Sequence, residues 1–164
     1  EREGIYKAYH MNKKYWVTIS LDDTLSDEEI MQYIEESYSY TVTTNEWVVP
    51  ANPKYYDVVN CFNNTKRVTW KQSSSIHEGD TVYLYVGAPY SCIMFKCKAL
   101  KTNIPYSYSN SNLTISNTMD LELVKAYPHD KYTFKEVSKY DLKAIRGPRR
   151  MPKKLLDYMK KQED

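Results

Sequence analysis

The stretch Glu78-Gly79-Asp80-Thr81-Val82-Tyr83-Leu84-Tyr85-Val86 decides the fold class of this chain. Its first three residues predict a tight turn, in which Gly79 supplies the required backbone freedom. The six residues after the turn alternate valine or leucine with other side chains, which is the period of two of a β-strand. One set of side chains is therefore expected to be buried and the other exposed, and the pattern does not decide which set faces a cavity.

Further strands are expected on both sides of this one. Short strands precede it at 47–49, where Pro50 is expected to end the strand, and at 68–70; longer ones follow at 91–100 and 119–126. Short helices are expected at 55–62 and after the capping box Thr133–Glu136, and Pro152 is expected to open a last helix. Residues 101–118, rich in Ser, Asn and Tyr, are expected to form a long loop. About five strands with peripheral helices predict an α+β fold built on a small curved β-barrel.

Residues 1–43 have a different pattern. A strand is expected at 15–21, and the capping box Ser26–Glu29 predicts a helix that runs to about residue 40. One strand and one helix cannot close a core. We therefore expect residues 1–43 to be the C-terminal portion of a domain whose beginning is missing, or a lobe that leans on the rest of the chain. The chain starts without Met and without a visible signal peptide.

Composition and charge limit the classes of function. The chain has 164 residues, 41% hydrophobic and 27% charged, which is typical of a globular protein. No apolar run reaches the ~20 residues of a membrane-spanning helix. Residues 1–43 carry a net charge of −5, residues 44–164 carry +7, and the last stretch, 142–164, carries +5. A basic body of this kind favours a nucleic-acid partner, and a merely solvated surface is the alternative.

The cysteines and histidines do not form a metal or disulfide pattern. Three cysteines without a CxxC pair, and three scattered histidines, argue against a zinc site and a disulfide framework. These residues are Cys61, Cys92, Cys97, His10, His77 and His129. We expect reduced thiols in a cytoplasmic protein, with Cys92 and Cys97 packed in a strand, and no metal or other cofactor.

An ordered series of motifs from residue 45 onward resembles a known family. The series is Trp47-Val-Val-Pro-Ala-Asn-Pro, Trp70-Lys-Gln-Ser, Ile76-His-Glu-Gly-Asp-Thr-Val-Tyr-Leu-Tyr-Val, Ile93-Met-Phe-Lys-Cys-Lys-Ala and Arg146-Gly-Pro-Arg-Arg-Met-Pro. It resembles the EVE domains, which belong to the PUA-like barrels. The resemblance implies an EVE domain of the PUA-like fold over residues 45–162.

The first segment resembles a second family. Tyr9-His-Met-Asn-Lys-Lys-Tyr-Trp, Leu21-Asp-Asp and Asp27-Glu-Glu-Ile, with a Ser-Tyr pair at 37–38, are similar to the C-terminal part of the MmcQ/YjbR proteins. Those are described as DNA-binding-like domains. The resemblance covers about the last forty residues of such a domain, here residues 1–43.

The EVE resemblance implies a reader of nucleic acid that takes one modified base into an aromatic pocket, as the similar YTH domains take methylated adenine. DNA or RNA is the implied partner. A base stacked on an aromatic ring gains ~1–3 kcal/mol, and its polar edge needs hydrogen-bond partners. The implied stacking walls are Trp47 and Trp70, the edge-reading side chains are Asn52, Gln72 and Ser73, and Tyr85 is a lining residue. The implied phosphate contacts are Lys71, Arg146, Arg149 and Arg150. Longer EVE proteins carry an Arg-Asn pair where this chain has Gln72-Ser73.

Two other classes of function are open. The ASCH domains, a related PUA-like branch, include small amidohydrolases and nucleases that use Lys, Thr and Glu, and Lys71 with Thr69 could supply part of that set. No carboxylate partner is identifiable, so we expect a protein that is not an enzyme. The third class is a protein-interaction module that contacts its partner through the tyrosine-rich segment 104–110. No membrane partner is expected.

Overall fold

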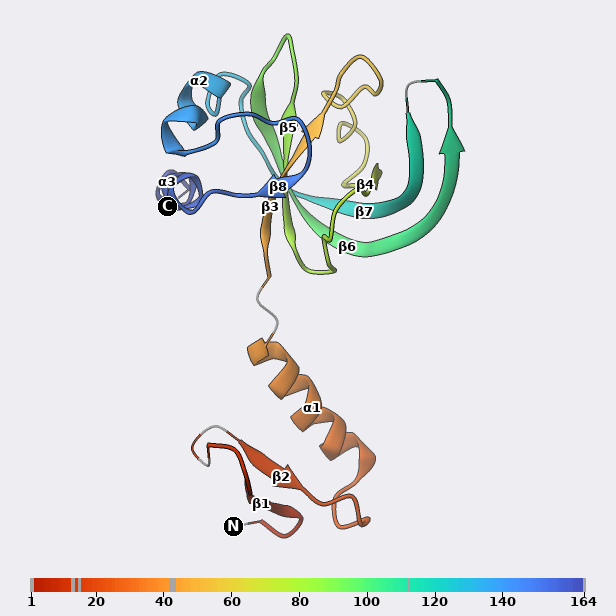
Figure 1. Cartoon of the computed structure of the whole chain (residues 1–164), viewed down its shortest axis with the longest axis vertical. Coiled ribbons are helices and arrows are strands. Elements are labelled where there is room, and N and C mark those ends of the chain that lie inside the picture. Colours follow the sequence, from red (N-terminus) through yellow and green to blue (C-terminus); the bar gives the residue numbers. More distant parts are fainter. Residues whose placement is uncertain (1, 13, 15, 42–43, 112, 164) are drawn as a thin grey trace. The chain divides into compact units, whose positions relative to one another are not determined.

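A computed structural model of the chain describes residues 2–12, 14, 16–41, 44–111 and 113–163. The chain forms two compact units, residues 1–43 and residues 44–164 (Figure 1). This division falls beside the position at which the sequence pattern changes.

The first unit consists of a β-hairpin and a helix. Strand β1 (Ile5–Lys7) pairs antiparallel with β2 (Val17–Ile19), and α1 spans Asp27–Thr41. The capping box is confirmed, because Ser26 Oγ accepts the Glu29 N–H at 3.3 Å and Glu29 Oε2 accepts the Ser26 N–H at 3.2 Å. The strand is shorter than the expected 15–21, and Tyr15 lies outside the described residues.

The second unit contains a six-stranded sheet. The strands are β3 (Glu46–Ala51), β4 (Arg67–Lys71), β5 (Thr81–Val86), β6 (Cys92–Ser109), β7 (Thr114–Ala126) and β8 (Arg149–Arg150). Their order is β4-β7-β6-β5-β3-β8; β3 and β5 are parallel, and the other pairs are antiparallel. The sheet curves round its core (Figure 1). The predicted α+β fold is confirmed, and the short β8 brings the expected five strands to six.

Both faces of β5 are buried. Val82, Leu84 and Val86 belong to the core inside the curved sheet. Tyr83 and Tyr85 belong to a second core, which the sheet forms with α2 (Phe134–Val137), the 3-10 helix η1 (Ser138–Tyr140) and α3 (Lys153–Lys161). The prediction that one set of side chains is exposed is wrong, because these helices cover the outer face.

The C-terminal helices begin where the sequence predicts. Thr133 is the N-cap of α2 and its side chain accepts the Glu136 N–H, and Pro152 is the N-cap of α3. Cys92 and Cys97 are buried on β6, as expected. No helix among the described residues is long and apolar enough to cross a membrane.

The expected loop at 101–118 is wrong. These residues continue β6 and begin β7, so that the two strands form one long hairpin (Figure 1). The turn is closed by Asn110, whose N–H donates to the Leu113 carbonyl at 2.9 Å and whose Oδ1 accepts the Leu113 N–H at 2.7 Å. The polar composition suggested a loop, but the two segments satisfy each other's backbone groups.

The hairpin bends at β-bulges along β6. Strand β6 has 18 residues and β7 has 13, and the register shifts at Ala99/Lys101, Lys101/Ile104 and Pro105/Tyr108. Each of these shifts places an extra residue on β6, and β-bulges bend a strand pair. Pro105 lies at one of the bulges, where proline is tolerated.

Two smaller predictions are also wrong. The segment 55–62 forms turns rather than a helix; the turns begin at Asn52, whose Oδ1 accepts the Lys54 N–H at 2.9 Å. Strand β3 continues through Pro50 to Ala51. The proline is tolerated because, in the described sheet, β8 pairs with β3 at Trp47 and Val48 and does not extend to Pro50.

Candidate functional site

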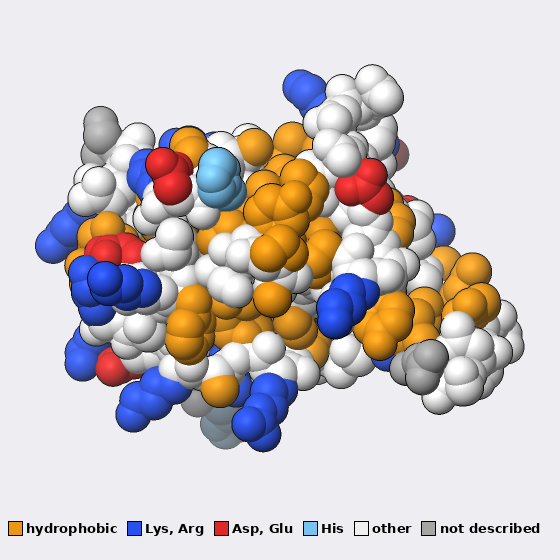
Figure 2. Space-filling model, turned by 90° about the horizontal axis from the view of Figure 1, so that it is seen from above, with side chains coloured by type: hydrophobic (Ala, Val, Ile, Leu, Met, Phe, Trp, Pro, Cys, Tyr) orange, Lys and Arg blue, Asp and Glu red, His pale blue; other side chains and the backbone are white. Residues whose placement is uncertain are grey.

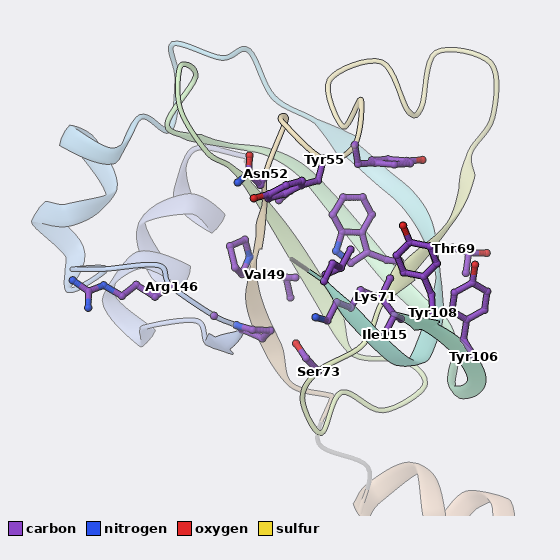
Figure 3. Close-up of a pocket in the computed structure, with 17 residues that line it drawn as sticks. Val49, Asn52, Tyr55, Thr69, Lys71, Ser73, Tyr106, Tyr108, Ile115 and Arg146 are labelled. Atoms are coloured by element: carbon purple, nitrogen blue, oxygen red, sulfur yellow. The ribbon is translucent and has the colours of Figure 1, made fainter. Parts of the chain in front are cut away.

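A pocket of about 550 Å³ lies where the sheet remains open. Among the described residues, β4 pairs with β7 alone, and beyond Val48 strand β3 pairs with β5 alone. Val49 to Ala51 on one edge and Thr69 to Lys71 on the other both line the pocket (Figure 3). The seam between two strand edges therefore forms the site, and strand edges present backbone donors and acceptors.

Five aromatic side chains line the pocket. Tyr55 and Tyr56 come from the turns after β3, Trp70 from β4, and Tyr106 and Tyr108 from the end of β6. The rings of Tyr56 and Trp70 are perpendicular, with centroids 5.3 Å apart. Trp70 is half-buried against the inner core, so its indole is held in place while part of it faces the cavity.

The polar groups at the pocket are basic or neutral. Asn52, Lys71, Ser73 and Arg146 line it, and none of the described lining residues is Asp or Glu. Figure 3 shows the Lys71 side chain among the lining side chains, whereas the Arg146 guanidinium points away from them. Because Asn52 Oδ1 accepts the Lys54 N–H, its Nδ2 amide is the group it can offer a ligand.

Part of the lining is made of aliphatic side chains. It consists of Val49, Pro50, Leu113 and Ile115, together with Ala51 and Pro148. Ile115 lies on β7 and Leu113 lies just before it, on the same hairpin as the two tyrosines. The site thus combines flat rings, aliphatic side chains and a few polar groups, which is typical of a small-ligand pocket.

Trp47 does not reach the pocket. Its side chain is 6% exposed, and its Nε1–H donates to Asp80 Oδ2 at 2.8 Å. The guanidinium of Arg150 lies over its ring, 4.0 Å from the centroid, which is a cation–π contact. The position does not support Trp47 as a stacking wall, because strand β3 turns this side chain into the core.

Asp80 is buried, and three N–H groups surround it. The donors are Asn45 N at 2.8 Å, His77 N at 3.0 Å and the Trp47 indole. Burial alone raises the pKa of the carboxyl group, but the hydrogen bonds from His77, Asn45 and Trp47 together lower that pKa below its ordinary value. His77 therefore meets Asp80 through its backbone, and this neighbourhood is structural.

Gln72 and Tyr85 also lie outside the pocket. Gln72 is buried, and its Nε2 donates to the carbonyls of Ser74 and Ile76 at 3.1 Å and to Asn103 Oδ1 at 3.2 Å. Its Oε1 accepts the Asn103 N–H at 2.6 Å. The side chain of Gln72 thus has its partners inside the protein and is not placed to read a base edge. Tyr85 packs in the outer core beside Phe134.

The remaining basic candidates lie on β8. Arg149 and Arg150 are exposed on this short strand, which pairs with Trp47 and Val48. Of the ten predicted site residues, the pocket brings together Asn52, Trp70, Lys71, Ser73 and Arg146. The face in Figure 2 shows hydrophobic side chains across its middle and most of its Lys and Arg side chains toward its margins.

Four tyrosines of the pocket were not predicted. They are Tyr55, Tyr56, Tyr106 and Tyr108. The alternation of Ile104, Tyr106 and Tyr108 at a period of two was a usable signal for a strand with one aromatic face. Tyr55 and Tyr56 carried no such signal, because their position depends on turns in a segment whose sequence pattern favoured a helix.

No group of three or more His, Cys, Asp or Glu side chains among the described residues could hold a metal ion. One polar contact at the pocket resembles part of a catalytic arrangement: Thr69 Oγ1 donates a hydrogen bond to Asp120 Oδ1 at 2.8 Å. Thr69 lines the pocket and Asp120 lies on β7 behind it.

No protein-family profile matches the chain, and no curated protein matches it. Its fold is similar to that of Rpa0253 from Rhodopseudomonas palustris, with a TM-score of 0.51 and 13% identity over 72% of this chain and 92% of the other. It is also similar to a single-residue mutant of the ASCH protein from Zymomonas mobilis, with a TM-score of 0.51 and 6% identity over 72% of this chain and 96% of the other. At these identities the likeness concerns the fold alone, and it agrees with the α+β fold built on a curved sheet.

Proposed function

We propose that residues 44–164 form a nucleic-acid-binding module that holds one extruded base in the aromatic pocket. The observation that carries this proposal is the lining itself: its described residues supply five aromatic rings and no carboxylate around a cavity of about 550 Å³. Ligand pockets usually measure ~300–1,000 Å³, and each base stacked on an aromatic ring gains ~1–3 kcal/mol. A lining of this kind avoids repulsion of the phosphates.

The polar groups suit the rest of a nucleotide. The Nδ2 amide of Asn52 and the hydroxyl of Ser73 can meet the polar edge of the base, which needs partners once it leaves water. Lys71 can pair with a phosphate. Arg149 and Arg150 on β8, and the net charge of +7 over residues 44–164, add to the attraction.

The apolar part of the lining favours a methylated base over a plain one. Val49, Pro50, Leu113 and Ile115 form an apolar part of the lining against which a methyl group can pack. Burial of one such group contributes ~0.8 kcal/mol. We therefore propose that the module prefers a base with an added methyl group, in agreement with the resemblance to the EVE domains.

A binding assay with Trp70→Ala tests the proposal. The probes are short DNA and RNA oligonucleotides, either plain or carrying methylated adenine or methylated cytosine, at two salt concentrations. We expect the variant to weaken binding of the preferred oligonucleotide by ~1–3 kcal/mol, and the wild-type affinity to fall steeply as salt rises.

Two further variants serve as controls for this assay. Trp16→Ala removes a tryptophan that is 45% exposed in the first unit, and it should leave the affinity unchanged. Trp70→Phe keeps a ring against Tyr56 and should retain most of the affinity and a wild-type circular dichroism spectrum. Equal affinity of a folded Trp70→Ala protein would remove Trp70 from the site, and binding that ignores salt would count against nucleic acid.

A hydrolase that acts on an acylated or otherwise modified nucleoside is the second candidate. It is favoured by one observation, that Thr69 and Lys71 both line the pocket and that Thr69 is bonded to the Asp120 carboxylate. This candidate predicts turnover of an acylated nucleoside that Lys71→Gln abolishes. If the wild-type protein releases no product while it binds oligonucleotides, the hydrolase is excluded for that substrate class.

A further inference from the structure

We infer, building on the proposed function, that Tyr106 and Tyr108 stack on the nucleotide next to the bound base, so that the ligand is unpaired beside the pocket. Single-stranded DNA or RNA, or an unpaired loop, is then the substrate class. The inference concerns the hairpin formed by the ends of β6 and β7, where the structure places an aromatic surface beside the pocket.

The two tyrosines are exposed although they line the pocket. Tyr106 is 51% exposed and Tyr108 is 45% exposed, whereas Trp70 is half-buried against the core. Figure 3 shows both rings on the hairpin side of the cavity, across from Asn52. They therefore extend the stacking surface from the pocket out along the hairpin, into the space that a neighbouring nucleotide would occupy.

The hairpin holds this surface in position. Gln72 joins the segment after β4 to the bend of β6, through the two hydrogen bonds with Asn103 at 2.6 and 3.2 Å. Its backbone N–H also donates to the Asn117 carbonyl on β7 at 2.9 Å. At the far end, Asn110 Nδ2 donates to Tyr108 Oη at 3.0 Å. A ring fixed in this way loses little entropy when a base stacks on it.

The hairpin carries no charge. Residues 102–118 contain no Asp, Glu, Lys, Arg or His, although 27% of the chain is charged. Its Ser, Thr, Asn and Tyr side chains can hydrogen-bond to a phosphate, but without Lys or Arg the segment adds no charge attraction to the phosphate backbone. It offers rings, hydroxyls and amides, which suit the faces and edges of bases.

In a paired duplex, the faces of the bases are stacked on one another and are not available to the tyrosines. When a base is flipped out of a duplex, its neighbours remain paired and stacked inside the helix. Aromatic side chains that stack on successive bases are the usual means of binding single strands. Two exposed tyrosines next to a base pocket therefore indicate unpaired neighbours.

The test measures the affinity of the full chain for three ligands. They are a short single-stranded oligonucleotide with one methylated adenine, the same oligonucleotide annealed to its complement, and methylated adenosine monophosphate; plain and methylated-cytosine versions run in parallel. We expect Tyr106→Ala and Tyr108→Ala to weaken single-strand binding by about 5- to 150-fold, and binding of the monophosphate to change far less. The annealed form should bind the wild type more weakly than the single strand.

Tyr90→Ala, which removes a tyrosine 39% exposed in the turn before β6, is the matched control and should bind like wild type. Tyr106→Phe keeps the ring and should retain the affinity, whereas Tyr108→Phe keeps its ring but loses the hydrogen bond from Asn110 and should lose less affinity than Tyr108→Ala. Equal losses for monophosphate and oligonucleotide, or tight duplex binding that depends on the tyrosines, would overturn the inference and leave the proposed function standing. Unchanged oligonucleotide affinity of both alanine variants would also overturn it and would favour a protein contact at this surface. Absence of binding to every ligand would overturn the proposed function, and the inference with it.

Discussion

Asp80 shows how one residue can organise the strands around it. The carboxylate accepts N–H groups from Asn45, Trp47 and His77, and the Asp80 carbonyl accepts the Ala99 N–H at 2.9 Å. These contacts connect the turn before β5 with β3 and β6. Asp80 is 2% exposed, so each bond lies in a region where lost partners are costly.

Asp80→Asn is expected to lower the free energy of unfolding by about 1.5–3 kcal/mol, because it removes hydrogen bonds to a charged group and places an NH₂ against N–H donors. The folded protein lowers the pKa of Asp80 below its ordinary 3.8. Its contribution is therefore present above that pH and is lost as the pH falls through the folded-state pKa. Urea unfolding at neutral and acidic pH measures both effects.

The control for this prediction is Asp157→Asn, which changes an aspartate on α3 that is not part of either core. It should unfold like wild type at each pH. If Asp80→Asn leaves the free energy of unfolding unchanged at pH 7, the three N–H groups find water or other acceptors. The turn then does not depend on this carboxylate.

At the scale of elements, strands with a regular apolar face could be predicted from the sequence. Thr81–Val86, Val68–Trp70 and the last helix were correctly placed, because their apolar residues recur at the period of a strand or a helix. The hairpin beyond Lys101 was not predicted, since its side chains are mostly polar and its pairing depends on a distant partner segment. Five of the ten predicted site residues lie outside the pocket for different reasons: Trp47, Gln72 and Tyr85 are buried inside the protein, and Arg149 and Arg150 are exposed on β8.

Gln72→Leu tests how the hairpin is held. The substitution keeps the volume of the side chain but leaves the Asn103 N–H and the Ile76 carbonyl without their partner. We expect a loss of about 1–3 kcal/mol in the free energy of unfolding, measured in urea, and weaker binding of single-stranded oligonucleotides because the tyrosines are less well positioned. Gln32→Leu, exposed on α1, is the matched control. Unchanged stability and affinity would contradict the anchoring role of Gln72.

At the scale of the whole molecule, the two units differ in how much they bury. Both hydrophobic cores consist of residues between Trp47 and Met159. In the first unit, the hydrophobic side chains described as buried are Ala8 and Leu25, whereas Trp16, Leu21 and Ile34 are exposed. A segment of about 40 residues seldom folds alone without a further source of stability. The second unit therefore has the means to fold independently, and the first does not.

A fragment of residues 44–164 is accordingly expected to unfold cooperatively in urea with the same midpoint as the full chain. Its oligonucleotide affinity should match or exceed that of the full chain, because the pocket and the hairpin lie within it and the fragment lacks the net charge of −5 on residues 1–43. A peptide of residues 1–43 should show little helix by circular dichroism. If the fragment 44–164 unfolds gradually, the second unit needs the first unit for its stability. If the fragment is folded but does not bind, the site needs the first unit. In either case the binding module would have to be assigned to the whole chain.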